Sequence, residues 1–377
     1  MEHSLDLTYH WAGFSALVVF VIAYAFVMAE EFTHLRKSKP VVLAAGLIWG
    51  MIAIAYSNTP HYEMVEHEIR HSFLEYTELA FFLLVAMTYI NALEERNVFN
   101  SLKSWLIKNQ FSYRQLFWIT GVLAFFLSPL ADNLTTALVL CAVVVAVGSS
   151  SPKFVGLACV NIVVAANAGG AFSPFGDITT LMVWQAGQLD FLQFFALVIP
   201  SVVNYIIPAS IMHFFVSDHK PDVAETSVTI KYGGKTIILL GLLTIVTAVS
   251  FHNFLHLPPV FGMMTGLAYL QLYSFYIKIS VKDIEEQKYD FFENVARVEW
   301  DTLLFFFGVI LSVGGLGFIG YLEYVSEFMY TDLGATTANV LVGILSAIVD
   351  NIPVMFAVLT MEPAMPDSQW LLVTLTA

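Results

Sequence analysis

The stretch FFLSPLADNLTTALVLCAVVV, residues 125–145, sets two polar side chains inside an apolar run that is otherwise suited to the interior of a membrane. Asp132 and Asn133 lie near its centre. Insertion scales put the cost of a charged side chain at the middle of a bilayer at about 2.5–3.5 kcal/mol. Such a carboxylate is therefore expected either to have local partners or to take part in moving ions.

The composition of the whole chain is that of a membrane protein. Of its 377 residues, 58% are hydrophobic and only 12% are charged, and the mean hydropathy is +0.74. A soluble domain has about 25% charged residues. The formal charge of −14 argues against a nucleic acid as partner. The sequence therefore predicts an all-α polytopic membrane protein.

Apolar runs long enough to cross a hydrocarbon core recur along the chain. The predicted spans are residues 11–30, 40–57, 74–92, 153–187 (interrupted), 191–216, 236–254, 259–277 and 299–319. The stretch before the third span, rich in His and Glu, is interpreted as a loop outside the membrane. Two further segments, 115–147 and 336–360, carry a polar dipeptide near their centres and are predicted to be re-entrant hairpins.

The distribution of basic residues agrees with this arrangement. With the N-terminus outside and both hairpins returning to their side of entry, Arg70 alone of the 16 Lys and Arg residues falls outside. A full crossing by either hairpin would place basic loops on the outer side.

Two motifs recur at similar offsets along the chain. EYTELAFF at 75–82 resembles EWDTLLFF at 299–306, an offset of 224 residues. Ser128 with Asp132-Asn133 is matched by Ser346 with Asp350-Asn351, an offset of 218. Because the first hairpin enters from inside and the second from outside, these are inverted-topology repeats, typical of secondary transporters. The predicted division is a first repeat at 1–216, a cytoplasmic linker at 217–235 and a second repeat at 236–377.

The two predicted hairpin tips share one chemistry. Each gathers an acid, an amide and hydroxyl groups: Ser128, Asp132, Asn133, Thr135 and Thr136 in the first, and Ser346, Asp350 and Asn351 in the second. Hard oxygen ligands suit a small cation. Desolvation favours the protonated carboxyl group, whereas a bound cation favours the ionised one, so a single Asp can exchange the two by competition. The alternative is an acid that only caps the N-terminus of a half-helix.

A third polar cluster lies in the interrupted span, NAGGAFSPFGDITT at 167–180. Its Gly and Pro residues are expected to break the helix and to free carbonyl groups. Asp177, Thr179 and Thr180 then begin the second half-helix, where Asp177 is either a helix cap or part of a binding site.

These motifs resemble those of NhaD-type sodium/proton antiporters, in the wider superfamily of arsenite permeases and divalent-anion/sodium symporters. The resemblance rests on LEYTELAFFLLVAMTYINALEERNVF (74–99), LADNLTTALVL (130–140), NAGGAFSPFGDITTLMVWQAG (167–187) and VDNIPVMFAVL (349–359). It implies extrusion of Na⁺ and Li⁺ in exchange for H⁺, without a further cofactor. It also implies a homodimer in the bacterial cytoplasmic membrane, with an elevator-like movement of the hairpin domain.

The resemblance also implies the residues that act. Residues that match the family's functional positions are Glu78, Asp132, Asn133, Asn167, Asp177, Thr179, Thr180, Ser346 and Asn351, with Asp350 added by the symmetry of the motif and His71 as a weaker match. Na⁺ is expected at Asp132, Asn133 and Asp177. His71, Glu75 and Glu78 share one helix face, so they are either a proton path or pH sensor, or simply an interfacial polar face.

Particular residues also suggest two rival functions. His67-Glu68-Ile69-Arg70-His71 fits the zinc metalloprotease pattern H-E-x-x-H, although no third ligand follows. An arsenite or dicarboxylate transporter of the same superfamily is the second rival. Asp132 and Asp350 would repel such an anion unless they were protonated or bound to sodium, which favours the cation antiporter.

The second repeat should continue beyond its hairpin with another Gly-rich broken helix. The repeat offset places its end at roughly residue 434, beyond Ala377. The chain is therefore expected to be incomplete at its C-terminus.

Overall fold

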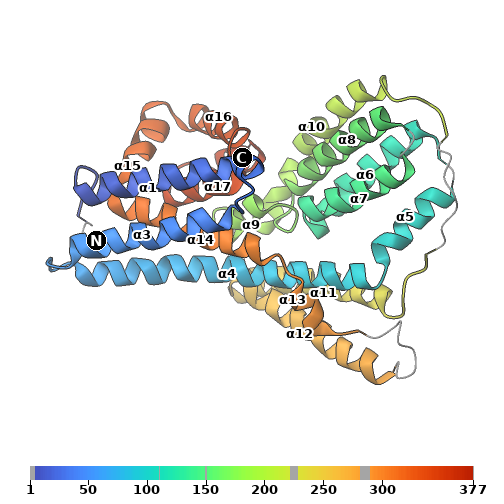
Figure 1. Ribbon diagram of the computed structural model, residues 1–377, viewed down its shortest axis with the longest axis horizontal. Helices are drawn as coiled ribbons and strands as arrows, with labels where there is room; N and C mark the ends of the chain where they lie inside the picture. Colours follow the sequence, from blue (N-terminus) through green and yellow to red (C-terminus); the bar gives the residue numbers. More distant parts are fainter. Residues whose placement is uncertain (1–4, 110, 149–150, 221–227, 281–288, 377) are drawn as a thin grey trace. The chain divides into compact units, whose positions relative to one another are not determined.

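The computed structural model describes residues 5–109, 111–148, 151–220, 228–280 and 289–376, and most of these residues form helices (Figure 1). No β-strand occurs within these ranges. The described residues contain nine helices that are long and apolar enough to cross a membrane. The chain is an all-helical polytopic membrane protein, as its composition predicts.

The helices form two compact units. The terminal unit comprises Met1–Leu83 and Glu299–Ala377, and the central unit comprises Leu84–Val298. The helix α4 (Tyr62–Glu95) contributes residues to both units.

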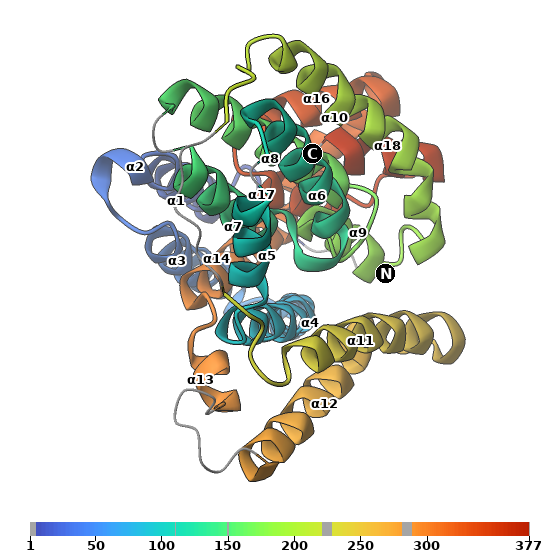
Figure 2. The ribbon, with the colours of Figure 1, turned by 90° about the vertical axis from the view of Figure 1, so that its right-hand side faces the viewer.

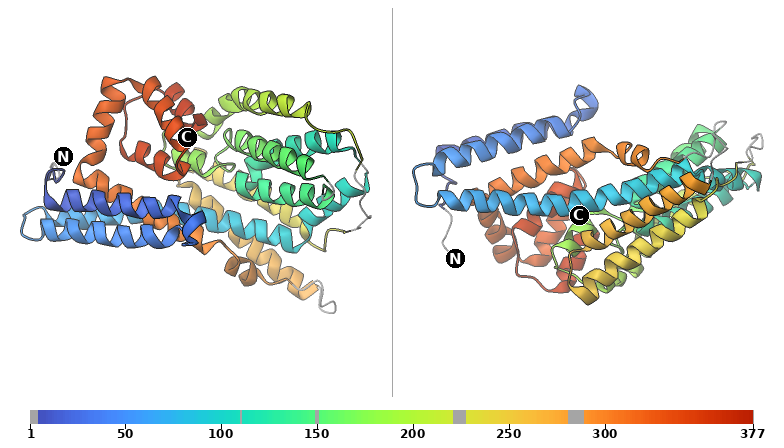
Figure 3. Two further views of the ribbon diagram at one scale, coloured as in Figure 1. Left: turned by 45° about the horizontal axis from the view of Figure 1, so that its top comes forward. Right: turned by 90° about the horizontal axis from the view of Figure 1, so that it is seen from below.

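The terminal unit is built around α14 (Trp300–Ile319), which is buried along most of its length. It packs on α3 (Ser38–Tyr56), which in turn lies beside α1 (Trp11–Met28) (Figure 3). Small residues allow the close approach, since a Cβ added at Gly308 would meet the backbone of Val41 and Val42 at 2.6 Å. The remaining elements are α2 (Glu30–Thr33), α15 (Tyr321–Ser326), the π-helix η3 (Glu327–Asp332), α16 (Ala335–Ser346), α17 (Asn351–Thr360) and α18 (Asp367–Thr376).

The central unit contains a helical cluster around α8 and a separate helix pair. The cluster comprises α6 (Tyr113–Ala131), α7 (Asn133–Val147), α8 (Pro152–Gly170), α9 (Ile178–Gln185), the 3-10 helix η1 (Phe191–Leu197) and α10 (Val198–His213). The helices α11 (Gly234–Leu255) and α12 (Pro259–Ser280) pack against each other (Figure 2). Two shorter helices are α5 (Val98–Lys108) and α13 (Phe291–Ala296).

Contacts along α8 show that α6 runs parallel to it. At the start of both helices, the rings of Tyr113 and Phe154 lie 4.3 Å apart between centroids. Near their ends, the Ser128 hydroxyl donates a hydrogen bond to the Ala166 carbonyl at 2.6 Å. The end of α6 is therefore level with the end of α8.

The helix α7 runs in the opposite direction along α8. Its first residue, Asn133, bonds to Asn167 near the end of α8. Further along α7, the Cys141 sulfur lies 4.0 Å from the Cys159 carbonyl oxygen, which belongs to an earlier part of α8. The segment predicted at 115–147 is thus two antiparallel helices that fold back at Asp132.

The predicted start of the third span is wrong. The helix α4 begins at Tyr62 rather than at residue 74, because the His- and Glu-rich stretch is an amphipathic helix and not a loop. Within it Val65 and Ser72 are buried, and Glu66 pairs with Arg70 one turn away at 2.7 Å. The span predicted at 191–216 is found as Phe191–His213, a stretch long and apolar enough to cross a membrane, in which η1 continues directly into α10. The short helices α5, α13, α15 and η3 were not predicted.

Candidate functional site

Asp132 forms the turn between α6 and α7 with a backbone conformation that only glycine adopts readily. Its φ is 54° and its ψ is 160°, a region that costs other residues on the order of 1–3 kcal/mol. Its carboxylate caps α7 by accepting hydrogen bonds from the Thr135 amide at 2.9 Å and the Thr135 hydroxyl at 2.8 Å. In the described chain no ion pair joins Asp132 to a basic side chain. The carboxylate is held in place by neutral donors.

Asn133 connects the tip of this hairpin to the broken helix. Its Nδ2 donates to Asp177 Oδ2 at 2.6 Å and to Asn167 Oδ1 at 3.1 Å. Asn167 lies near the end of α8, and Asp177 immediately precedes α9. One amide therefore joins both sides of the helix break to the hairpin.

Asp177 begins the second half-helix as its cap. Its Oδ1 accepts hydrogen bonds from the Thr179 amide at 3.1 Å and the Thr179 hydroxyl at 3.2 Å. The Thr180 hydroxyl bonds to two backbone carbonyls, of Ser173 at 2.9 Å and of Asp177 at 2.7 Å. Thr180 therefore stabilises the break itself, whereas the Thr179 hydroxyl faces the carboxylate.

The glycines of the break let three backbone segments meet. A Cβ on Gly170 would lie 2.6 Å from the Gly176 carbonyl oxygen, and a Cβ on Gly169 would collide with the backbone of Phe125 in α6. Ser173 adds a hydrogen bond from its hydroxyl to the Pro129 carbonyl at 2.9 Å. Ser173 was not among the predicted site residues, although its place between glycines next to a proline was visible in the sequence.

The central unit thus brings together six predicted residues, which we call the tip cluster: Asp132, Asn133, Asn167, Asp177, Thr179 and Thr180. The tip cluster contains the carboxylates of Asp132 and Asp177, the side-chain amides of Asn133 and Asn167, and the Thr179 hydroxyl. Hydrogen bonds of Asn133 and Asp177 connect these groups. Oxygen-rich groups of this kind are the ligands of hard cations.

The other predicted tip residues, Ser346, Asp350 and Asn351, belong to the terminal unit. Asp350 caps α17 by accepting a hydrogen bond from the Ile352 amide at 3.3 Å. Its Oδ2 also forms an ion pair with Lys37 Nζ at 3.0 Å. The same ammonium group lies 4.2 Å from the centre of the Phe305 ring. In contrast to Asp132, the carboxylate of Asp350 has a cationic partner.

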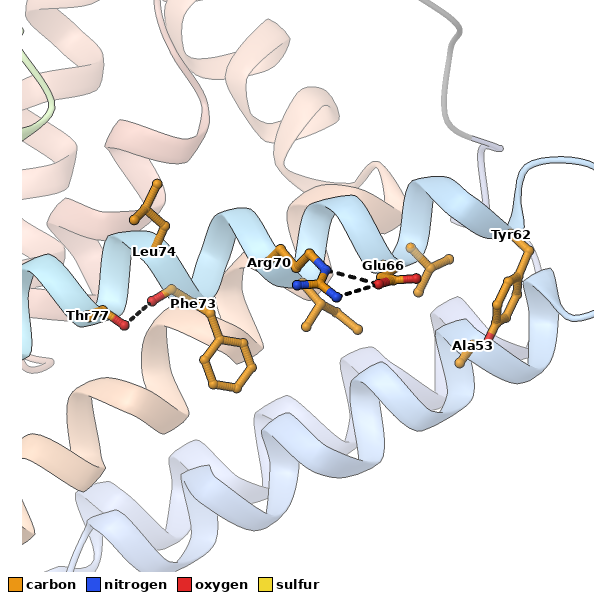
Figure 4. A pocket seen from close by; sticks show the side chains of 9 residues that line it. Ala53, Tyr62, Glu66, Arg70, Phe73, Leu74 and Thr77 are labelled. Carbon is orange, nitrogen blue, oxygen red and sulfur yellow. Dashed lines mark hydrogen bonds and ion pairs between the residues drawn. The ribbon is translucent and has the colours of Figure 1, made fainter.

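The predicted polar face of α4 has one internal contact. His71 Nδ1 lies 3.9 Å from Glu75 Oε1, and Glu78 is half-buried one turn further along. An open pocket lies on the same helix near α3, and the Glu66–Arg70 ion pair lines it (Figure 4). Apolar side chains, including Phe73 and Leu74, form the rest of its wall.

The H-E-x-x-H segment lies within α4. Over the residues that the structure describes, no group of three or more His, Cys, Asp or Glu side chains is placed to hold a metal ion. The segment therefore has no third ligand there.

Comparison with known proteins adds a family and close relatives. The model of a citrate transporter family, CitMHS, matches residues 11–377. The Na(+)/H(+) antiporter NhaD of Vibrio cholerae is 54% identical over 395 residues, which cover 99% of this chain and 83% of that protein. The proteins of the same name in Alkalimonas amylolytica and Halomonas elongata are each 52% identical over 394 residues. Those alignments cover 99% of this chain and 82% and 80% of the two relatives.

Proposed function

Because this chain belongs to the NhaD family of Na⁺/H⁺ antiporters, we infer that it exchanges Na⁺ for H⁺ across the membrane that its apolar helices cross. The description of the matching family model names citrate. The relatives that match at more than half identity are named for Na⁺ and H⁺ instead, and they give no support to anion transport or to a zinc protease.

We propose that the tip cluster is where the two ions compete. Asn133 bonds to Asp177 and directly follows Asp132, so both carboxylates belong to one small polar site. A dehydrated Na⁺ or Li⁺ would take oxygen ligands from Asp132, Asp177 and the Asn133 carbonyl group. Protonation of a carboxyl group removes the charge that holds the cation, and cation binding expels the proton. The observation that carries this proposal is the Asn133–Asp177 bond between hairpin and broken helix.

The second tip is proposed to contribute Ser346, Asp350 and Asn351 to ion binding. Since Lys37 is paired with Asp350 Oδ2, the ammonium group would compete with a cation for that carboxylate. Glu78 and His71 are proposed as a proton path or pH sensor on α4.

The oligomeric state, the membrane and the orientation of the protein are proposed from its family and from the distribution of its basic residues. We propose a homodimer in the bacterial cytoplasmic membrane with the N-terminus outside, which transports Na⁺, Li⁺ and H⁺. It is a transporter and not an enzyme, and it needs no cofactor beyond these ions. Purified protein in liposomes with only salts and buffer should therefore exchange Na⁺ for H⁺.

The substitution Asp132→Asn tests the assignment. The amide keeps the volume, and its oxygen can still accept the bond from the Thr135 amide while its NH2 group donates to the Thr135 hydroxyl. It cannot exchange a proton for a cation. Na⁺-dependent dequenching of a pH-sensitive dye in everted vesicles should disappear at normal protein levels. Glu66→Gln is the matched control, because that carboxylate is 64% exposed and pairs with Arg70. Normal proton flux in the Asp132→Asn protein would refute the role of this residue.

A further inference from the structure

A second cavity, of ≈ 680 Å³, lies in the central unit where α6 begins and α10 ends. Its polar lining includes Arg114, Lys220, His213 and Asp218, and its apolar lining includes Trp118 and Ile119. None of these residues belongs to the tip cluster, which lies at the opposite end of α6.

The guanidinium group of Arg114 is held in place by a hydrogen bond, but not all of its N–H groups have an acceptor. One terminal nitrogen donates to the Val216 carbonyl at 3.1 Å, which holds the side chain against the segment after α10. The Nε atom is buried and has no hydrogen-bond acceptor within the described residues. Because the Nε atom is out of reach, a ligand in the cavity that Arg114 lines would meet the guanidinium group through its terminal nitrogens.

The aromatic side of the cavity is fixed as well. Trp118 Nε1 donates to His213 Nδ1 at 3.0 Å. With Nδ1 as acceptor, the proton of the neutral ring is on Nε2, which is then a further donor. The bond connects α6 to α10 and holds the apolar wall of the cavity in place.

The charge of the cavity is positive. Arg114 and Lys220 supply two permanent cations, and Asp218 is the one acid in the described lining. Lys220 and Asp218 are both exposed. A ligand with a negatively charged oxygen group would complement this balance.

Exposed aromatic side chains lie near the cavity. Phe214 is 81% exposed and Phe215 59% exposed at the end of α10, and Trp105 on α5 is 51% exposed. The centroid of the Trp105 ring lies 6.0 Å from that of Phe111, which lines the cavity. Trp side chains gather at the level of lipid headgroups, so Trp105 favours a position of the cavity near that level.

We propose that this cavity binds the phosphate headgroup of an anionic phospholipid, with the phosphate on Arg114 and Lys220 and the start of an acyl chain on Trp118 and Ile119. Basic pockets between membrane helices are suited to such headgroups. The apolar wall favours a lipid over inorganic phosphate, because only a lipid has an acyl chain that can pack against Trp118 and Ile119. The bound lipid would hold together the start of the hairpin and the end of α10.

The test uses the full-length protein purified in detergent and its melting temperature during titration with phosphatidylglycerol. The lipid should raise the melting temperature of the unchanged protein. Arg114→Gln and Lys220→Gln should each need about fivefold more lipid for half the effect, the loss expected for one basic residue near an anionic surface. Lys220 is exposed and lies outside the described helices, so its variant is expected to fold normally.

Lys153→Gln is the matched control, since Lys153 is an exposed basic residue in the first turn of α8 but does not line the cavity. It should respond to lipid as the unchanged protein does. Unaltered lipid responses in both cavity variants would overturn the proposal, as would an equal loss in Lys153→Gln. Stabilisation by inorganic phosphate equal to that by the lipid would overturn the assignment to a phospholipid.

Discussion

Both the oxygen and the nitrogen of the Asn133 side-chain amide form hydrogen bonds at the hairpin tip. Its Oδ1 accepts a hydrogen bond from the Leu134 amide at 2.8 Å, while its Nδ2 donates to Asn167 and Asp177. The donated bond to Asp177 is charge-assisted and therefore stronger than a bond between neutral groups. It orients one oxygen of that carboxylate and leaves the other to Thr179.

We expect Asn133→Ala to weaken Na⁺ binding more than it slows turnover. Without the amide, Asp177 loses a bond that orients it, and the proposed Na⁺ site loses one of its ligands. The Na⁺ concentration for half-maximal dequenching should therefore rise about tenfold, as for the loss of a hydrogen bond to a charged group. Asn91→Ala is the control, because the Asn91 amide bonds to the Asn294 carbonyl outside the tip cluster. An unchanged half-maximal concentration would exclude Asn133 as part of the binding site.

At the scale of the element, the break between α8 and α9 depends on the close approach of its glycines. Gly170→Ala would place a methyl group 2.6 Å from the Gly176 carbonyl oxygen. We expect this substitution to lower the melting temperature and to abolish exchange, because the loop would have to move away from the hairpin. The measurements are thermal unfolding in detergent and dye dequenching.

Gly156→Ala on the same helix is the matched control. Nothing lies within 4 Å of a Cβ at that position, and alanine favours a helix over glycine by about 1 kcal/mol. This variant should be at least as stable as the original chain and should transport normally. Equal effects of the two substitutions would contradict the packing argument.

The sequence predicted the elements whose signals are local. Gly, Pro and Gly between 169 and 176 indicate the break, and Asp132-Asn133 indicates the turn of the hairpin. The first turns of α4 were missed because His and Glu side chains there suggested a loop, whereas i,i+4 pairing makes them helical. The Asn133–Asp177 bond joins residues 44 positions apart, and no local pattern encodes such a pairing. The Lys37–Asp350 ion pair could not be predicted either, because it also joins residues far apart in the sequence.

For the whole molecule, the basic loops predict one orientation in the membrane. Lys231 and Lys235 flank the start of α11 and His256 follows its end, so this helix should cross from inside to outside. A fluorescent protein fused after Lys231 should fluoresce, and alkaline phosphatase fused after His256 should be active. Phosphatase activity of a fusion at Lys231 would show the opposite orientation.

The backbone conformation of Asp132 also limits how the thermostability of the protein can be increased. A glycine there would release the strain of the turn and would delete the carboxylate at the same time. Selection for thermostability alone should therefore favour Asp132→Gly, whereas selection for growth in high sodium should reject it. Selection for stability alone is therefore expected to yield a well-folded chain that no longer transports, because the strained residue of the hairpin is also the one proposed to bind the transported ions.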